Sequence, residues 1–253
     1  MLRTPAPLIG ALGFMYKQIR GLNPPDLSSQ SLWRYVPSHR LKDILKTNEL
    51  YFSQITKLVD AREGTLTNRT RDQLAALYQK QQSLTIPQAY DATDEYLKHQ
   101  ERFYVNCWHM NDYESHLMWR AYADRGFAIK TTFERITDAF SSVTGTVYGG
   151  VVTYHDFNHD QTSFGNVFRH VVTKDMPYQD EREFRLVFWR LDPNNASLLS
   201  ESAGIRIPVD VPMLIGSLIR NPFGATIDAE LEELIESHKL VVQSSGVAVR
   251  RPV

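Results

Sequence analysis

The order of the segments predicted to be regular constrains the fold most, because strands outnumber helices and the two do not alternate strictly. Strands are predicted where aromatic and β-branched residues run together between turn-forming residues. They cover residues 32–36, 50–53, 103–110, 127–133, 146–154, 181–189, 204–209, 214–220 and 247–250. Helices are predicted over residues 38–48, within 60–82, over 89–100 and 114–124, and from residue 228 onward. This order favours an α+β fold over a doubly wound parallel sheet.

Length and composition favour one domain. The chain has 253 residues, 42% hydrophobic and 23% charged, and no Gly/Ser-rich or Pro-rich stretch that would serve as a linker. We predict an N-terminal extension over residues 1–30 and a single α+β domain over residues 31–253. The apolar run at residues 7–16 is far shorter than the ~20 residues of a membrane-spanning helix, so no membrane association is expected. We expect the extension to dock on the domain or on a partner protein.

Charge and cysteine content narrow the possible functions. The 28 Lys and Arg against 29 Asp and Glu give a formal charge of -1, so no overall basic balance points to nucleic acid. The single Cys107 excludes an internal disulfide framework and fits a reducing compartment, so a cytoplasmic location is expected. Gly-rich phosphate loops and the G-x-S-x-G and H-E-x-x-H motifs are absent. His155 and His159 have helical metal-ligand spacing, but their neighbours predict a strand end and a loop, so no metal is expected.

The predicted strand at residues 181–189 carries two carboxylates. With the period of two of a strand, the apolar residues Phe184, Leu186 and Phe188 share one face. Glu181 and Glu183 then share the other face, roughly 7 Å apart, where one could orient a ligand and the other react. The alternative interpretation is that these charges only line a solvated face.

Aromatic residues accompany these charges along the chain. Trp33, Tyr35, Tyr51 and Trp108 lie on the same predicted strands as Arg34 or on strands that follow it. Aromatic side chains are usually part of the core. A nucleotide site, however, needs a flat surface for a ring, a guanidinium for phosphate or ribose, and an acid for the reacting sugar. The sequence offers all three.

An ordered series of motifs resembles the bacterial family called domain of unknown function 2971, over roughly residues 31–220. The residues that carry the resemblance are Leu32-Trp33-Arg34-Tyr35-Val36, Leu50-Tyr51-Phe52-Ser53, Asp60, Glu63, Cys107-Trp108, Met118-Trp119-Arg120-Ala121-Tyr122, Lys174, Tyr178, Glu181, Glu183 and Arg185. The turn at residues 58–63 keeps both acids of the family's usual Phe-Asn-Asp-Pro-Phe-Glu but loses its Asn and Pro. The family name implies no activity.

A second, weaker resemblance is to ADP-ribosyltransferase domains, including the DNA-modifying toxin branch. It rests on the opening strand, short helix and Leu-Tyr-Phe-Ser strand, and it implies a single domain with a mixed or antiparallel split sheet and flanking helices. By this resemblance Arg34 matches the first-strand residue that holds the ribose of NAD, and Tyr51 or Ser53 the residue that shapes the nicotinamide pocket. Glu183 matches the late acid, with Glu181 as the first member of a Glu-x-Glu pair.

The chemistry of NAD cleavage agrees with these assignments. The nicotinamide bond breaks through an oxocarbenium-like state, which a carboxylate such as Glu183 stabilises. Arg34 would bind ribose or pyrophosphate, while Tyr35 or Tyr51 stacks on the nicotinamide and Trp108 completes the cofactor site. Glu181 would direct the acceptor. We therefore expect an NAD-dependent transferase that modifies a macromolecule, protein or nucleic acid, as a bacterial toxin or antiphage defence effector.

Two other functions stay open at this point. A binding or scaffold module of a bacterial defence or toxin system would use the Glu/Arg strand as a structural salt-bridge network and perform no chemistry. A metal-dependent nuclease would need clustered acids with a lysine. Asp60, Glu63, Glu181 and Glu183 supply acids, but Arg185 stands where the usual Asp/Glu-x-Lys signature has lysine.

Overall fold

The computed structural model describes residues 14–140, 145–198 and 203–248. The strands are β1 (Phe14–Lys17), β2 (Ser31–Val36), β3 (Glu49–Gln54), β4 (Phe103–Met110), β5 (Phe127–Thr132), β6 (Gly145–Val151), β7 (Thr153–His155), β8 (Thr173–Asp175), β9 (Glu183–Trp189), β10 (Gly204–Pro208), β11 (Ser217–Arg220) and β12 (Val242–Ser244). The α-helices are α1 (Ser38–Thr47), α2 (Asn68–Gln82), α3 (Ile86–Leu97), α4 (His116–Tyr122), α5 (Phe133–Ala139), α6 (Val167–Val171), α7 (Val211–Leu214) and α8 (Ala229–Ser237). Short 3-10 helices are η1 (Ile55–Lys57), η2 (Lys98–Arg102), η3 (Met176–Glu181) and η4 (Pro193–Leu198).

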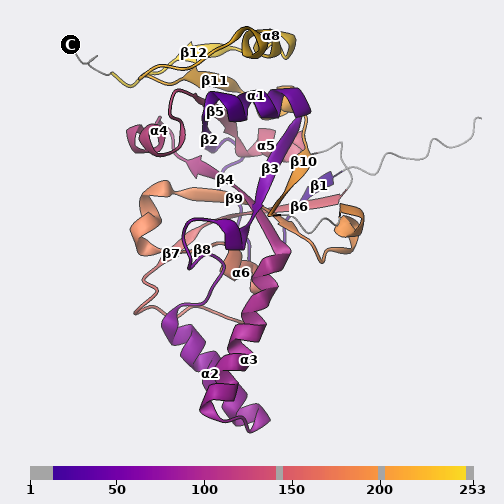
Figure 1. Cartoon of the computed structure of the whole chain (residues 1–253), viewed down its shortest axis with the longest axis vertical. Helices are drawn as coiled ribbons and strands as arrows, with labels where there is room; N and C mark the ends of the chain where they lie inside the picture. The colour runs from indigo at the N-terminus through magenta and orange to yellow at the C-terminus, as the bar shows by residue number, and fades with distance from the viewer. Residues whose placement is uncertain (1–13, 141–144, 199–202, 249–253) are drawn as a thin grey trace, which may run out of the picture.

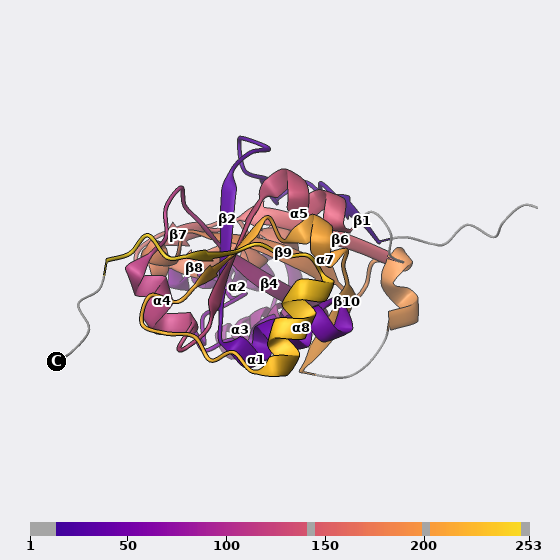
Figure 2. The ribbon, with the colours of Figure 1, turned by 90° about the horizontal axis from the view of Figure 1, so that it is seen from above.

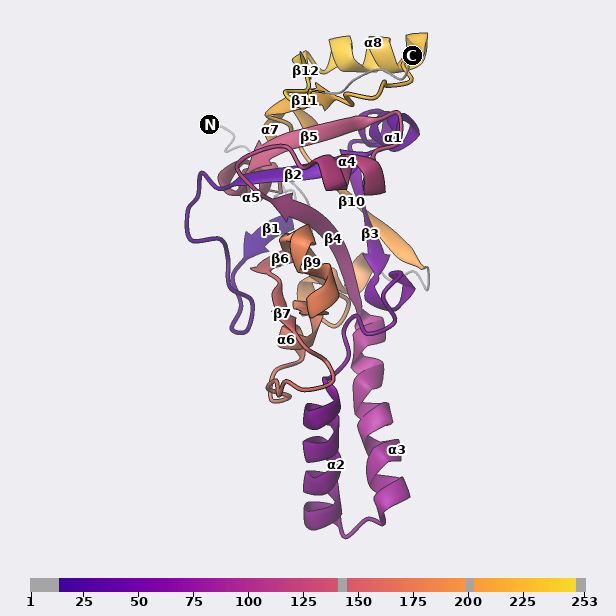
Figure 3. The ribbon, with the colours of Figure 1, turned by 90° about the vertical axis from the view of Figure 1, so that its left-hand side faces the viewer.

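One large mixed sheet organises the described part of the chain, which confirms the predicted α+β class. Its strand order is β1-β6-β9-β4-β2-β5-β11-β12, and β3 branches from β4 and pairs with β10. The pairs β1–β6 and β11–β12 are parallel, whereas β4 is antiparallel to each of its neighbours. Strands β7 and β8 form a separate parallel pair. Figures 1 and 3 show α2 and α3 as a hairpin that projects from the body at the end opposite α8.

The sheet divides along β4, and this division positions the site described below. On one edge β4 pairs with β9 along its whole length, from Phe103↔Trp189 to His109↔Glu183. On the other edge its first residues pair with β3, through Ser53↔Val105, and its last residues pair with β2. The two strands therefore diverge and leave the middle of β4 open on that side.

The connection between β2 and β3 explains this divergence. Helix α1 has only ten residues and buries Leu41, Ile44 and Leu45, the apolar face that the three-and-four spacing predicts. It ends at Asn48 in the left-handed conformation, whose N–H bonds to Ile44 O at 2.9 Å. Seen from above, α1 lies beside α8, and both cover one end of the sheet (Figure 2). After this short connection, β3 pairs with the first residues of β4, at the end opposite to the residues that pair with β2.

Strand β9 shows the predicted apolar face, but the face that carries its charges is not solvated. Phe184, Leu186 and Phe188 belong to the main core, as expected. Its other face is also buried, with Glu183 4% and Arg185 0% exposed. The solvated-face interpretation is therefore wrong, because β8 and the turn after η1 cover these charges. Glu181 is not on the strand: it ends η3, and Arg182 follows with φ 42°.

Several predicted boundaries need correction. The strand predicted at 146–154 is interrupted between β6 and β7, and the one at 127–133 ends before Phe133, which begins α5. The strand predicted at 214–220 contains the end of α7, whose Pro212 occupies the first turn that tolerates proline. The last strand lies at 242–244 instead of 247–250; residues 249 and 250 fall outside the described residues.

The first described residues fall within the predicted extension. Strand β1 pairs in parallel with β6 at the sheet edge, through Tyr16↔Val147, and Leu22 is buried in a second core cluster. Residues 1–13, with most of the apolar run, lie outside the described residues. Among the described helices, none combines the length and apolar character needed to cross a membrane.

Gly126, in the turn between α4 and β5, is expected to tolerate no side chain. A Cβ there would lie 2.0 Å from Val36 O and 2.6 Å from Pro37 Cα, and neither backbone atom can rotate away. We expect Gly126→Ala to lower the free energy of unfolding in urea by about 2 kcal/mol. Gly165→Ala is the control, because its Cβ would meet only Ser163 Oγ at 4.0 Å. Equal stability of the two variants would contradict this packing.

Candidate functional site

A pocket of about 290 Å³ opens where β2 and β3 diverge from β4. It is lined by all seven residues that the sequence assigns to a site: Arg34, Tyr35, Tyr51, Ser53, Trp108, Glu181 and Glu183. Strands β2, β3, β4 and β9 each contribute at least one of them. The divergence of the sheet thus brings together side chains that are up to 149 residues apart in sequence (34 to 183).

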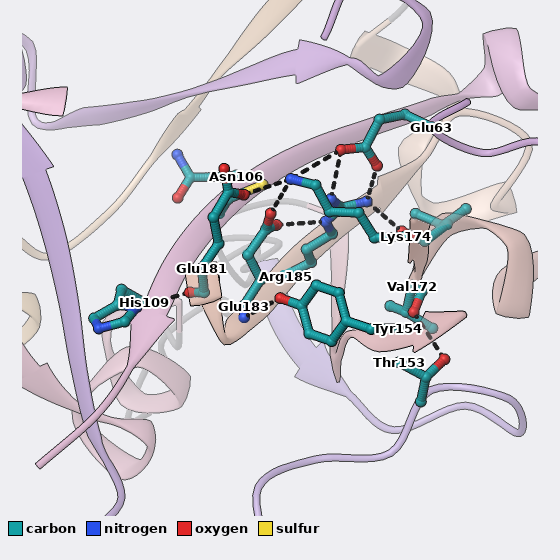
Figure 4. A network of polar contacts seen from close by, with 12 residues as sticks. Glu63, Asn106, His109, Thr153, Tyr154, Val172, Lys174, Glu181, Glu183 and Arg185 are labelled. Atoms are coloured by element: carbon teal, nitrogen blue, oxygen red, sulfur yellow. Dashed lines mark hydrogen bonds and ion pairs between the residues drawn. The ribbon is translucent and has the colours of Figure 1, made fainter. Parts of the chain in front are cut away.

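A buried ion-pair network forms one wall of this pocket (Figure 4). Arg185 is fully buried, and its Nε lies 2.8 Å from Glu183 Oε2 while its Nη1 lies 2.7 Å from Glu63 Oε2. Lys174 Nζ lies 2.5 Å from Glu183 Oε1, 2.5 Å from Glu181 Oε2 and 3.2 Å from Glu63 Oε1. Lys174 comes from β8, outside the main sheet, and Glu63 from the turn after η1. The network therefore joins β8, β9, the end of η3 and the turn after η1.

The charges of neighbouring groups determine which members of the network are ionised. Burial opposes ionisation of Glu183. The positive charges of Arg185 and Lys174, together with the hydrogen bond from Arg185, nevertheless hold the pKa of Glu183 well below its usual range. Burial also opposes the charge of Lys174 and Arg185, yet the charges of Glu183 and Glu63 raise the pKa of both. Glu183, Lys174 and Arg185 are therefore ionised near neutral pH.

Glu181 differs from Glu183 in being open to the pocket. Its side chain is 18% exposed, against 6% for Glu183. Its Oε1 accepts a hydrogen bond from the Tyr122 hydroxyl at 2.7 Å, and its Oε2 faces Lys174. Burial, together with the neighbouring Glu183, raises the pKa of Glu181. Because Glu183 is nearly buried between two cations and Glu181 is partly exposed, Glu181 is the acid of this pair that a ligand can reach.

The pocket is also lined by a guanidinium, that of Arg34, which no carboxylate in the described part of the chain neutralises. Arg34 Nη1 donates to Asn106 Oδ1 at 2.8 Å and to Cys107 O at 2.7 Å, and both acceptors are neutral. Its Nε is buried without a hydrogen-bond partner, and no ion pair of Arg34 occurs among the described residues. Burial lowers the pKa of Arg34, which reflects the cost of an uncompensated charge.

The Asn106 side chain bridges the gap in the sheet with hydrogen bonds. Its Nδ2 donates to Tyr51 O on β3 at 2.9 Å, while its Oδ1 accepts from Arg34 on β2 and from Trp108 Nε1 at 2.8 Å. The side chain is 1% exposed. One amide thus links both diverging strands to β4.

The aromatic residues divide into buried and accessible rings. Tyr35 is 6% exposed, and its hydroxyl accepts a hydrogen bond from Ser115 N at 2.8 Å, so it forms part of the wall. Trp108 is 1% exposed and lies beneath the Arg34 guanidinium, 5.9 Å from ring centroid to Cζ. Tyr51 is 37% exposed at the pocket mouth. Because Tyr51 and Ser53 are two residues apart on β3, both line the pocket, and the choice between them stays open.

Sequence reasoning assigned no role to Asn106, and gave Tyr122 and Lys174 a place only in the family resemblance. No local pattern signals these residues, since each contacts a partner from another element. The His109 ring is held in place by a hydrogen bond: its Nδ1 lies 2.7 Å from Glu181 O, and burial lowers its pKa. Burial also raises the pKa of the Cys107 thiol, as is typical of a packed, unreactive cysteine.

The acids of the pocket are arranged as an ion-pair network. Among the residues that the structure describes, no three His, Cys, Asp or Glu side chains are placed to hold one metal ion. The Lys174 ammonium lies between Glu63, Glu181 and Glu183, at the point where a bridging cation would lie.

Comparison with known proteins gives no further guide to the site. No family model matches the chain, and neither a curated protein nor a solved structure matches it significantly. Both resemblances stated from the sequence therefore stay predictions.

Removing Arg185 is expected to destabilise the fold strongly. Arg185→Met leaves Glu63 and Glu183 buried without their main counter-charge, which costs about 3–5 kcal/mol of unfolding free energy. Arg206→Met is the matched control, because Arg206 pairs with Asp43 at the surface and such pairs contribute about 1 kcal/mol or less. Urea denaturation of both variants measures the difference; similar losses would show that the buried network contributes no more than a surface pair.

The network also predicts a pH dependence of stability. The folded-state pKa of Glu183 lies well below its ordinary value of 4.5, so its contribution to stability is complete well above pH 4.5 and is lost as the pH falls below 4.5. We expect Glu183→Gln to be less stable than the wild type at neutral pH, with a gap that narrows as the pH falls through this window. Urea denaturation across the pH range measures the gap. A gap that is constant with pH would mean that Glu183 has no lowered pKa.

Proposed function

We propose that this protein is an NAD-dependent ADP-ribosyltransferase-like enzyme that modifies a macromolecule. One observation carries the proposal: Arg34, without a neutralising acid, and Glu181, accessible and acidic, line the same aromatic-walled pocket. A ligand that matches this polarity carries negative charge at one end and a positively charged aromatic ring at the other. NAD has both, in its diphosphate and its nicotinamide.

The proposed roles follow from the charge or the exposed surface that each side chain offers to a ligand. Arg34 binds the diphosphate, because its charge is uncompensated and its planar fork suits phosphate oxygens. Tyr51, at the mouth, stacks on a ring of the ligand, and Ser53 lies beside it. Tyr35 and Trp108 form the buried wall behind them. The division of the sheet at β4 supports the proposal of an ADP-ribosyltransferase-like split fold.

The proposed chemistry assigns the reacting acid to Glu181. The bond between ribose and nicotinamide breaks, its electron pair leaves with the nicotinamide, and an oxocarbenium-like sugar remains. The Glu181 carboxylate stabilises this positive charge, the acceptor nucleophile attacks the sugar carbon, and the acceptor's proton passes to Glu181. A carboxyl with a raised pKa suits this second step. Glu183, the acid favoured from sequence, holds Lys174 and Arg185 instead.

The acceptor is proposed to be a protein or a nucleic acid, which the open mouth of the pocket can admit. Tyr122 and Tyr51 flank that mouth and are 46% and 37% exposed, respectively. Exposed aromatic side chains contact both peptide chains and unstacked bases. A role as a bacterial toxin or antiphage defence effector, with a partner bound through the N-terminal extension, completes the proposal.

A second candidate function is a binding module without chemistry. It is favoured by the burial of the Glu183–Arg185 network, which is the structural salt-bridge arrangement that such a module would use. In that case the pocket binds its ligand without cleaving it. The nuclease has less support, because the Lys174 ammonium already lies among the acids.

Replacing Glu181 tests both candidates. We expect Glu181→Gln to reduce nicotinamide release from NAD by about 100-fold or more, since it removes the charge that stabilises the oxocarbenium state. Its dissociation constant for NAD, measured by calorimetry, should stay within about threefold of wild type, since Arg34 is unchanged. Glu236→Gln, an exposed acid on α8, is the control. Chromatography of released nicotinamide measures turnover.

The wild type itself separates the functions. NAD binding without nicotinamide release would favour the binding module over the enzyme. Absence of both binding and release would overturn the NAD proposal, whatever the variant does.

A further inference from the structure

Lys174 contacts three carboxylates that belong to three different segments. Its Nζ lies 2.5 Å from Glu181 Oε2, 2.5 Å from Glu183 Oε1 and 3.2 Å from Glu63 Oε1. The ammonium donates hydrogen bonds to Glu181 and Glu183, and it forms an ion pair with Glu63. The side chain is 7% exposed. Although Lys174 lines the pocket, its ammonium is nearly buried and is surrounded by these carboxylates, which favours a role that acts through them.

Two donors fix the carboxylate of Glu181, one on each oxygen. The Tyr122 hydroxyl from α4 donates to Oε1, and Lys174 from β8 donates to Oε2. Arg185 does not reach Glu181; its ion pairs are with Glu63 and Glu183. Within the described residues, Lys174 is therefore the cation that joins Glu181 to the buried network, beside the direct contact of Glu181 with Glu183.

This link is needed because Glu181 does not lie on a strand. It ends the short helix η3, just before Arg182 turns the backbone with φ 42°. The backbone here is held by the bond between Arg182 N and Gln179 O and by His109 Nδ1 at Glu181 O. Neither contact sets the direction of the side chain. The Lys174 ammonium is the cation through which the buried network holds that side chain.

We propose that Lys174 is a positioning residue. Its ammonium holds the Glu181 carboxylate in one orientation against the buried network and keeps this carboxylate ionised and facing the pocket. Its effect on catalysis rests on the proposed function; its effect on Glu181 does not. The ionisable groups that face Glu181 are Lys174, Glu183, Tyr122 and His109. Tyr122 and His109 stay neutral around pH 7, since burial raises the pKa of the former and lowers that of the latter.

The direct test is the titration of Glu181 in the ligand-free protein. Carbon NMR of the labelled glutamate carboxyl carbons, assigned with Glu181→Gln, follows it in the wild type and in Lys174→Met. We expect the apparent pKa of Glu181 to rise by about one pH unit or more in Lys174→Met, because an adjacent cation is lost and Glu183 is freed to repel it. Lys42→Met is the control: Lys42 also bridges two acids, Asp228 and Glu230, but at the surface.

A second variant guards against misfolding. If Lys174→Met does not fold, Lys174→Gln removes the charge and keeps hydrogen-bond donors, so the same rise is expected from it. An unchanged apparent pKa of Glu181 in a folded variant without the lysine charge would overturn the proposal.

The kinetic arm separates this proposal from the proposed function. In Lys174→Met the acid limb of the pH profile of nicotinamide release should move up by the same amount as the NMR titration, with kcat at pH 7 reduced and KM for NAD changed less than about threefold. A purely structural role of Lys174 would lower the amount of folded protein without moving this limb. A wild type without nicotinamide release would sink the transferase proposal, and the NMR titration would still decide the role of Lys174.

Discussion

The burial of one guanidinium organises the region around the pocket. Arg185 is 0% exposed, and moving such a charge from water costs several kcal/mol unless every polar atom finds a partner. Glu183 and Glu63 supply the counter-charge, and Val171 O at the end of α6 accepts from Nη1 at 2.8 Å. A turn, a strand and a helix are therefore held together by one side chain. Because any displacement of these elements would leave a charge unpaired, the wall of the pocket they form is rigid.

The contrast between the two arginines of the pocket shows where a ligand is expected. Arg185 is paired with two carboxylates, Glu63 and Glu183. Arg34 is desolvated too, but an amide and a carbonyl are its acceptors. Arg34 therefore keeps a positive charge without a counter-ion in the pocket that Glu181 also lines, and this charge makes an anionic ligand group energetically favourable there.

The sequence predicts the periodic parts of this structure and misses what depends on distant partners. The alternation of Phe184, Leu186 and Phe188 and the α1 face were predicted correctly, since each reflects a local period. The seven proposed site residues do line one pocket. The burial of Glu183 and Arg185 was not predictable, because β8 and the turn after η1 cover them and no local pattern encodes that cover. The same reason hid the roles of Lys174 and Asn106, whose partners come from other elements.

Asn106 shows how the fold and the chemistry of the pocket depend on each other. In an ordinary sheet, backbone hydrogen bonds would fill the edge of β4, but β2 and β3 diverge there. The Asn106 amide replaces that ladder, donating to Tyr51 O and accepting from Arg34. An aspartate of the same shape would hold Arg34 equally well but would neutralise it and repel the Tyr51 carbonyl. A neutral amide therefore closes the gap in the sheet without giving the guanidinium a counter-charge, so its positive charge stays available to a ligand.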